Sequence, residues 1–231
     1  MKTFTLLCAA MLAASSAFSA PTKEEAKRLS EAGAILDELR TTPEKGIPED
    51  LWNKAQCVIV IPSIKKGAFV IGGEYGKGVM SCRSGRDWSA PVFMELAKGS
   101  WGLQIGGEQI DLVMLLMNRR GLDKLLQDKV SLGADASLAA GPVGRSGSAA
   151  TDAQLHAEML SYSRSQGVFA GIDLSGGVLR PDKDATKNAY GPDADAKNVV
   201  MSEHRVAELD AAGPFLRALR QEARATTGRS K

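Results

Sequence analysis

Few residues of this chain have the types and spacing that catalysis requires. A nucleophilic hydroxyl or thiol needs a base within hydrogen-bonding reach, and the chain contains two histidines, His156 and His204. His156 precedes Glu158 by two positions on a predicted strand, which favours a surface contact, and His204 is expected to face solvent on a predicted terminal helix. The serine in the run 144–148 lacks the final glycine of the nucleophile elbow of hydrolases. The chain therefore has no recognisable catalytic constellation.

The glycines between Gly72 and Gly78 look like a phosphate-binding loop only superficially. A P-loop places a glycine five residues before its Gly-Lys pair, and a serine or threonine directly after the lysine. Ile71 stands at the first of these positions and Gly78 at the second. We therefore interpret this run as a hairpin corner in which glycine relieves steric strain.

Three aspartates, Asp111, Asp135 and Asp173, interrupt apolar runs. Burial of an unpaired carboxylate is costly, so each is expected to accept hydrogen bonds from nearby backbone or side-chain donors. Arg145 could form a salt bridge with one of them, or it could recognise an anion. A hydrolase site of unfamiliar type around His156, Arg145 and Asp135 is the weakest of the functional hypotheses.

The first 19 residues have the organisation of a secretory signal peptide. Lys2 supplies the positive charge, residues 4–14 form an apolar segment, and Ala17 and Ser19 are the small residues expected before a cleavage site. No later segment approaches the roughly 18 uninterrupted apolar residues of a membrane span. We therefore expect cleavage after Ser19 and an exported mature chain, periplasmic or secreted and peripheral to the membrane.

Two cysteines remain after this cleavage, Cys57 and Cys82. Export permits a disulfide, and the two residues lie on predicted strands that could be neighbours in a meander. A disulfide and two buried thiols remain alternatives. Two cysteines without nearby histidines cannot build a zinc site, so we expect neither a metal nor a cofactor.

The formal net charge of +2 identifies no charged partner, because only the distribution of charge can indicate one. Five basic and two acidic residues lie in 62–90, and seven basic and four acidic residues lie in 197–231. This asymmetry is mild and gives no reason to expect nucleic acid. A solvated surface is the simplest interpretation of both segments.

Local patterns predict that the mature chain begins with helices. Thr22 to Glu25 forms a capping box, and apolar residues at helical spacing extend the predicted helix to about Leu39. Pro48 then begins a short helix that runs through Lys54, because proline is tolerated in a first turn.

Most of the glycines, 20 of 24, lie between Gly67 and Gly191 among runs of β-forming residues. Glycines inside strands mark bulges, bends or close approach of backbones, which predicts one curved antiparallel unit. A helix is predicted separately at 119–127. A C-terminal helix over 202–225 is predicted to break near Gly213 and Pro214. The predicted strands are 57–61, 67–73, 78–83, 91–97, 101–106, 109–117, 129–140, 155–163, 168–174 and 176–180.

These elements predict an α+β fold, with a curved, largely antiparallel β-sheet or barrel-like core and flanking N- and C-terminal helices. The expected organisation is a signal peptide over 1–19, one domain over 20–191, and a C-terminal helical extension and tail over 192–231.

Several strings, in their order along the chain, resemble one family. They are GGEYGKG at 72–78, WSAP at 88–91, GSWGLQIGG at 99–107, DLVMLLMN at 111–118, LGADAS at 132–137, AGPVGR at 140–145, SYSRS at 161–165, GVFAG at 167–171 and LRPD at 179–182. In these strings the chain is similar to the SYLF domain, also called the Ysc84 actin-binding or DUF500-type domain. The resemblance covers about residues 22–191.

The resemblance implies binding to anionic phospholipids, with phosphoinositide-like headgroups in the eukaryotic members. Those members bind through basic surface and an N-terminal amphipathic helix, and fungal members also bind actin. This chain departs from them in its predicted export. An exported bacterial member is not expected to meet actin, so affinity for an acidic lipid surface is the property that carries over.

Basic residues of segment 62–90 are the first candidates for lipid contact, because a Lys or Arg near an anionic membrane contributes about 1 kcal/mol. Lys65 and Lys66 occupy a predicted turn. The first helix adds three basic residues, although its acidic residues fit a core-packed helix with a solvated face equally well. The candidate lipid-binding residues are Lys65, Lys66, Lys77, Arg83, Arg86, Lys23, Lys27 and Arg28.

A periplasmic scaffold that binds protein partners is the alternative function. Lipid binding would then be incidental, and neither hypothesis involves catalysis. The docking element would be the C-terminal helix, whose apolar residues are Val206, Leu209, Phe215, Leu216 and Leu219.

Overall fold

The computed structural model describes most of the chain from residue 20 onward. The predicted signal peptide, residues 1–19, lies outside the described part. No helix in the described part has the length and apolar character needed to cross a bilayer. The described residues are 20–41, 46–67, 71–85, 87–101, 109–143, 154, 156–165, 168–201 and 209–227.

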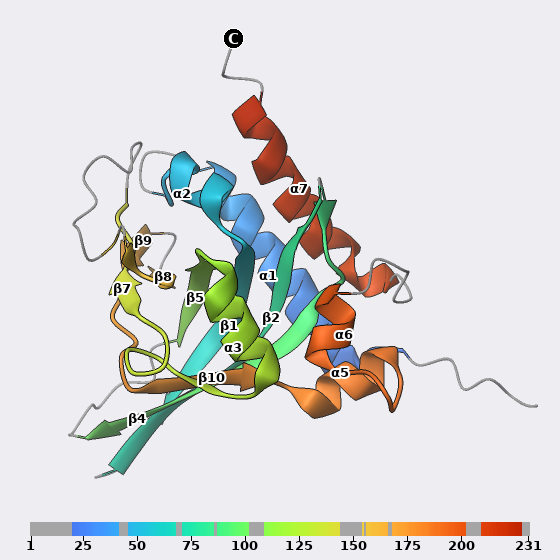
Figure 1. Cartoon of the computed structure of the whole chain (residues 1–231), viewed down its shortest axis with the longest axis horizontal. Coiled ribbons are helices and arrows are strands. Elements are labelled where there is room, and N and C mark those ends of the chain that lie inside the picture. Colours follow the sequence, from blue (N-terminus) through green and yellow to red (C-terminus); the bar gives the residue numbers. More distant parts are fainter. Residues whose placement is uncertain are drawn as a thin grey trace, which may run out of the picture.

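A curled, ten-stranded sheet occupies the centre of the described structure (Figure 1). Its strands are β1 (Cys57–Gly67), β2 (Ile71–Ser84), β3 (Asp87–Trp88), β4 (Val92–Trp101), β5 (Gln109–Leu116), β6 (Val130–Ser131), β7 (Leu138–Ala140), β8 (Met159–Ser165), β9 (Val168–Gly171) and β10 (Gly177–Pro181). The strand order is β6-β10-β4-β2-β1-β5-β8-β7, with β3 beside β2 and β9 beside β8. The β7–β8 pair is parallel, and the other named pairs are antiparallel.

Helices cover both faces of this sheet. They are α1 (Lys23–Thr41), α2 (Glu49–Lys54), α3 (Arg119–Gln127), α5 (Lys183–Tyr190), α6 (Ala196–Met201) and α7 (Gly213–Thr227), with a 3-10 turn at Asp210–Ala212. On the first face, here called the α1 face, α1, α2 and α7 pack with Val60, Val79 and Phe93. On the opposite α3 face, α3 and α6 pack with Ile59 and Met80. The predicted α+β class and largely antiparallel sheet are confirmed.

Helix α1 begins as the sequence predicts. The backbone N–H of Thr22 donates to Glu25 Oε2 (2.6 Å), and the N–H of Glu25 donates to Thr22 Oγ1 (3.3 Å), which completes the capping box. Leu29 and Leu36 are fully buried. Gly33 faces the backbone of Pro214 in α7 so closely that an added Cβ would lie 3.0 Å from it. Helix α1 is therefore a core helix clamped between the sheet and α7.

Helix α7 begins at Gly213, where the sequence predicts a break, and has proline in its first turn. Residues 202–208 of the predicted helix lie outside the described part. Phe215 and Leu219 of α7 are fully buried in the same hydrophobic cluster as α1. The hydrophobic core therefore continues well beyond residue 191, where the sequence placed the end of the domain.

Strand β1 is longer than predicted because of a bulge. Its register shifts between Ile61 and Ile64, where Ser63 has a φ of 50° and donates its N–H to Asp111 Oδ1 (2.9 Å). The strand resumes after the bulge and ends at Gly67. The predicted turn at Lys65 and Lys66 is wrong, since both residues lie in β1 and pair with β2.

Two other predicted strands are shortened. Segment 129–140 forms the short strands β6 and β7 on either side of a turn, in which Gly133 has a positive φ of 87°. Segment 155–163 enters the sheet only at Met159. In the first segment, turn chemistry prevails over the local preference for extended backbone.

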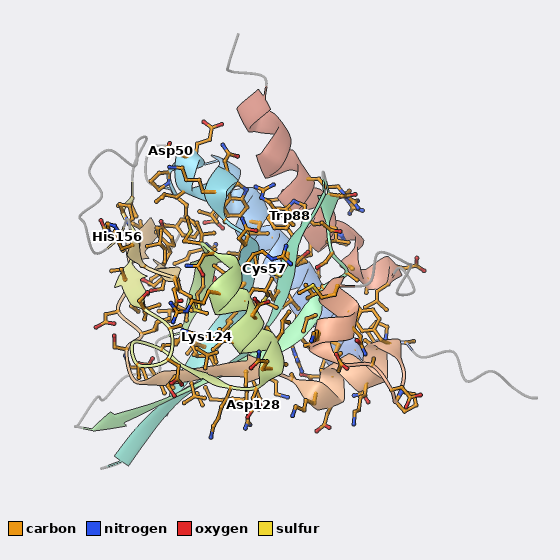
Figure 2. All side chains as sticks on the ribbon, in the orientation of Figure 1. Asp50, Cys57, Trp88, Lys124, Asp128 and His156 are labelled. Atoms are coloured by element: carbon orange, nitrogen blue, oxygen red, sulfur yellow. A yellow bond between two sulfur atoms is a disulfide. The ribbon has the colours of Figure 1, made fainter. Side chains whose placement is uncertain are left out.

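The two mature cysteines lie directly opposite each other on β1 and β2. A disulfide joins Cys57 and Cys82, which is one of the two alternatives that the sequence leaves open. Both residues are buried, and Cys57 lies near the middle of the molecule (Figure 2). The crosslink fastens the two central strands of the sheet.

Replacing both cysteines with alanine should lower the free energy of unfolding by about 3 kcal/mol, because the crosslink reduces the entropy of the unfolded chain. Urea denaturation followed by circular dichroism measures this. Denaturation of the unaltered protein with a reductant present should reproduce the loss, since unfolding exposes the disulfide. Equal midpoints for the variant and the oxidised protein would contradict the prediction.

Candidate functional site

The strands β2, β4 and β10 extend past the helices that cover the α1 face. Val79 and Phe93 are the last fully buried register pair on this face. Two residues further along each strand, Lys77 lies opposite Glu95, and Glu95 lies opposite Arg180. These three residues, here called the ion-pair row, mark the boundary between the core and an open part of the sheet.

Two carboxylates anchor the ion-pair row. Lys77 Nζ lies 2.8 Å from Asp182 Oδ2, and Arg28 of α1 reaches the same oxygen at 3.2 Å. Glu95 receives the guanidinium of Arg180 on one oxygen, and the hydroxyl of Tyr75 donates to the other at 2.8 Å. One network therefore links α1 with β2, β4 and β10.

The cation is the outer partner in both the Lys77–Asp182 pair and the Arg180–Glu95 pair. The Lys77 side chain is 37% exposed, whereas that of Asp182 is 6% exposed. The Arg180 side chain is 57% exposed, whereas that of Glu95 is 14% exposed. Formal charges balance within these two pairs, yet solvent meets mainly ammonium and guanidinium groups, because the carboxylates lie beneath them.

Asp182 also begins a helix. Its side chain accepts the N–H of Ala185 at 3.2 Å and so caps α5. Burial acts to raise the pKa of the Asp182 carboxyl, but the hydrogen bonds from Lys77 and Ala185 prevail and hold this pKa below its usual value. The hydrogen bond to Asp182 likewise raises the pKa of Lys77. Both groups therefore stay charged.

Beyond the ion-pair row the α1 face is open. Tyr75 lies opposite Ala97; Tyr75 is 44% exposed, and Ala97 is also exposed. Burial and the hydrogen bond to Glu95 raise the pKa of the Tyr75 hydroxyl, so it remains a neutral donor. This residue presents an aromatic ring with its polar end satisfied.

The next row consists of glycine alone. Gly67, Gly73 and Gly99 lie opposite one another across β1, β2 and β4, and we call them the glycine row. The last pair of β2 and β4 is Ile71 opposite Trp101.

The fold itself does not require two glycines of this row. Neither Gly73 nor Gly99 has a positive φ; a Cβ added at Gly99 would meet nothing within 4 Å, and one at Gly73 would make only an ordinary contact at 3.7 Å. Gly78, on the same strand, is different, because its Cβ would lie 2.1 Å from the carbonyl oxygen of Val60. Glycine in a strand interior reduces stability. Gly73 and Gly99 therefore lower the stability of the fold, although the fold has room for a larger residue at both positions.

The predicted basic residues of the described part lie on several different elements. Lys65 and Lys66 lie on β1, with Lys65 opposite Tyr75 in register. Lys23 and Lys27 are exposed at the start of α1, and Lys27 lies 3.7 Å from Glu31. Arg86 lies outside the described residues.

Arg83 has a structural role that the sequence did not reveal. Its guanidinium donates to the carbonyl oxygens of Ala55 (2.9 Å) and Trp52 (3.2 Å) at the end of α2. It also stacks on Trp88 at 4.7 Å, and burial lowers its pKa. Arg28 is held in a similar way, since it contacts Asp182 and lies over the ring of Phe93. Neither side chain points freely into solvent.

The aspartates that interrupt apolar runs accept local hydrogen bonds, as predicted. Asp135 accepts the N–H of Ser131 (2.9 Å), and Asp173 accepts that of Ser175 (2.8 Å). Asp111 holds the β1 bulge and pairs with Arg164. The proposed partner Arg145 lies outside the described residues.

The hypothetical hydrolase site includes Arg145, which lies outside the described residues. Glu158 is buried and pairs with Lys124 at 3.2 Å, while it also accepts the N–H of Ser137. His156 is exposed and lies at the margin of the molecule (Figure 2). The prediction that these two residues share the face of one strand is wrong, because β8 begins only after Glu158. Among the described residues, no three metal-binding side chains come together.

The C-terminal helix of the scaffold hypothesis is packed into the hydrophobic core. Phe215 and Leu219 are fully buried, Leu209 is nearly so, and Leu216 is partly buried against the same cluster. Val206 lies outside the described residues. The described apolar residues of this segment therefore serve the core and cannot form the free docking surface that the scaffold hypothesis needs.

Sequence reasoning missed Tyr75, Glu95, Arg180 and Asp182. One signal was present, because residues two positions apart in a strand share a face. The interpretation of the run 72–78 as a hairpin corner is wrong, since this run lies inside strand β2 and places Tyr75 and Lys77 on one face. The neighbours of β2 in the sheet had no such signal. The pairing of β10 with β4 joins residues more than 80 positions apart, and this alone brings Arg180 to Glu95.

Comparison with known proteins agrees with the resemblance that the strings in the sequence indicate. The family model described as "Ysc84: Las17-binding protein actin regulator" matches residues 97–222. LAS seventeen-binding protein 3 of Saccharomyces cerevisiae is 31% identical over 77% of this chain and 39% of its own length. The SH3 domain-containing YSC84-like protein 1 of Xenopus laevis is 34% identical over 74% of this chain and 51% of its own length.

These findings define an α+β domain with an open, cation-bearing end of its sheet. The chain belongs to the Ysc84, or SYLF-domain, family. It spans about two fifths to one half of the length of these relatives. The relatives are named as binding or SH3-containing proteins and not as enzymes.

Substituting Asp182 with asparagine should lower the free energy of unfolding at neutral pH by about 1–3 kcal/mol, because Lys77 and Arg28 lose their shared charged acceptor. The pKa of Asp182 is depressed in the folded state, so its contribution exists above its unfolded pKa and disappears as pH falls through the folded one. Denaturation from pH 7 to pH 2 should show the variant and the unaltered protein converging below the usual value of 3.8. A constant difference over that range would contradict the prediction.

Replacing Gly73 with alanine should leave stability unchanged or raise it by about 0.5–1 kcal/mol, because alanine restricts the unfolded chain and the site has room. Gly78→Ala is the matched control on the same strand and should destabilise by about 1–3 kcal/mol through overpacking. Urea midpoints compare the two. Equal losses in both variants would show that the glycine row is structural.

Proposed function

We propose that this protein is a non-enzymatic, peripheral binder of anionic phospholipid membranes, and that the open end of its α1 face meets the lipid. One observation carries the proposal: in the Lys77–Asp182 and Arg180–Glu95 pairs the cation is exposed and the carboxylate is covered. A phosphate approaching from solvent would reach Lys77 and Arg180 before it reached Asp182 or Glu95.

The arrangement favours phosphate recognition without loss of the internal pairs. Arg180 contacts Glu95 through one edge of its guanidinium, and a planar guanidinium has donors for a second acceptor. Lys77 has three donors, of which Asp182 uses one. Each cation near an anionic bilayer contributes about 1 kcal/mol, and salt screens this attraction.

Insertion of α1 is a poorer route for this chain. The apolar side of α1 carries Leu29, Ile35 and Leu36, which are buried against the sheet and α7. Exposing them to lipid would require opening the core at a cost of about 1.5–3 kcal/mol per large side chain. We therefore assign lipid contact to the sheet, with Lys23 and Lys27 as peripheral charges.

Membership of the SYLF-domain family supports a binding function, and the resemblance described above supports anionic lipid as the ligand. We further propose that the protein is exported and acts in the periplasm or outside the cell. The disulfide between Cys57 and Cys82 supports an oxidising compartment. Phosphoinositide-like headgroups are one class of anionic lipid to which the surface is suited.

Replacing Lys77 and Arg180 together with glutamine should weaken binding to anionic vesicles by about tenfold or more, since two charges of about 1 kcal/mol each are lost. Glutamine is chosen because Asp182 keeps Arg28 and Glu95 keeps Tyr75. Flotation with vesicles of phosphatidylcholine and phosphatidylglycerol, at increasing salt, measures the effect.

The matched control is Arg119→Gln with Lys129→Gln. These residues are exposed at the two ends of the α3 region, which covers the opposite face, and the control changes net charge by the same amount. It should bind as the unaltered protein does. Equal recovery with neutral and anionic vesicles, or equal weakening by both double variants, would reject the proposal.

A further inference from the structure

We propose that Tyr75 and Arg28 are positioning residues of the lipid site: they hold the two carboxylates of the network while its outer cations turn towards lipid phosphates. The outer cations are Lys77 and Arg180. This inference rests on the proposed function and adds to it the residues that make these cations available. Neither Tyr75 nor Arg28 has to contact lipid in this role.

The hydroxyl of Tyr75 gives Glu95 a partner besides Arg180. Glu95 contacts the guanidinium of Arg180 through Oε1, and its Oε2 accepts the hydroxyl of Tyr75 at 2.8 Å. A covered carboxylate that loses its last partner is costly. Because Tyr75 stays in place, a phosphate can draw Arg180 outward and Glu95 still has a hydrogen-bond donor.

Arg28 has the same role for Asp182. Oδ2 of Asp182 receives Arg28 at 3.2 Å and Lys77 at 2.8 Å, and its other oxygen accepts the N–H of Ala185. The Arg28 side chain is 14% exposed and lies 5.9 Å from the centre of the Phe93 ring, so it is held against the core. Lys77 is the more exposed of the two cations, and it can move outward while Arg28 stays with Asp182.

The network contains more cations than carboxylates. Arg28, Lys77 and Arg180 supply three positive charges, and Asp182 and Glu95 supply two negative ones, which leaves one positive charge in excess. An outer cation can therefore shift its hydrogen bonds towards a phosphate without leaving a carboxylate unpaired.

The ion pairs at the other end of α1 have the reverse composition. Arg164 of β8 contacts the carboxylates of both Asp111 and Glu38. Moving Arg164 outward would break two ion pairs, whereas Lys77 and Arg180 each form one among the described residues. The Arg164 cluster is suited to fastening α1, and the network at the open end of the sheet is suited to sharing a cation with a ligand.

Removing the hydroxyl of Tyr75 should hold Arg180 more tightly. Oε2 of Glu95 would then be able to accept the second edge of the guanidinium, and a bidentate pair between arginine and a carboxylate is stronger than a contact through one edge. Arg180 would have fewer donors left for a phosphate. The substitution Tyr75→Phe keeps the ring and the net charge, so it tests this hydrogen bond alone.

Flotation with phosphatidylcholine–phosphatidylglycerol vesicles measures the effect. Tyr75→Phe should weaken binding by about two- to tenfold, the effect of one hydrogen bond. In an Arg180→Gln background the same substitution should cause no further loss, because it acts through Arg180. A Lys77→Gln background is the matched control, in which Tyr75→Phe should keep its full effect, since Lys77 pairs with Asp182 instead.

A second comparison tests Arg28. Arg28→Gln should weaken binding at least about twofold more than Lys27→Gln, because Asp182 without Arg28 holds Lys77 more tightly. Both substitutions remove one charge from α1, and Lys27 is the more exposed residue, at 71% against 14%. Simple attraction to the bilayer would therefore give the opposite order. Thermal denaturation confirms that each variant is folded.

The outcomes separate this inference from the proposed function. If Tyr75→Phe binds as tightly as the unaltered protein, the positioning role is overturned and anionic-lipid binding stands. A loss that persists in the Arg180→Gln background would also overturn it, because the hydroxyl would then act on the lipid directly. An equal or larger loss in Lys27→Gln would remove Arg28 from the proposal. Absence of binding by the unaltered protein to any anionic vesicle would reject the proposed function, and this inference with it.

Discussion

One buried carboxylate sets the geometry of the open end of the sheet. Asp182 accepts contacts from Arg28 of α1 and Lys77 of β2, and it caps α5. Its backbone N–H also donates to the carbonyl oxygen of Phe93 on β4. A charge in a nearly buried position is tolerated only when its partners are in place. The start of α1, strands β2 and β4, and the start of α5 are therefore fixed relative to one another.

The same carboxylate lies where helical cover ends. On its inner side, Val79 and Phe93 pack beneath α1, and on its outer side Tyr75 and the glycine row face solvent. A strand of 14 residues such as β2 is longer than the helices can cover. The uncovered part of the sheet differs from an ordinary solvated surface, because the carboxylates of Asp182 and Glu95 lie beneath the cations of Lys77 and Arg180. Membership of a family whose relatives are named for binding fits a domain with such a surface.

Much of the local structure could be predicted, because the partners involved are close in sequence. The capping box joins Thr22 and Glu25, and Asp135 and Asp173 bind backbone groups within four residues. The basic residues were predicted less well. Arg28 meets Asp182 across 154 positions, and Lys77 meets it across 105. A lone cation in a sequence looks solvated until the fold brings its acid to it, so Arg83, Arg28 and Lys77 were all expected to be free.

Sequence patterns were enough to predict the α+β class, the positions of most helices and strands, the break at Gly213, and the family. Those properties follow from periodicity, from turn chemistry and from the strings that resemble the family, all of which are local along the chain. Three features became visible only in the fold: α1 and α7 belong to the core, the ion-pair row exists, and its cations face outward. Strand order and burial decide these features, and both arise from contacts between residues far apart in the chain, which no local pattern records.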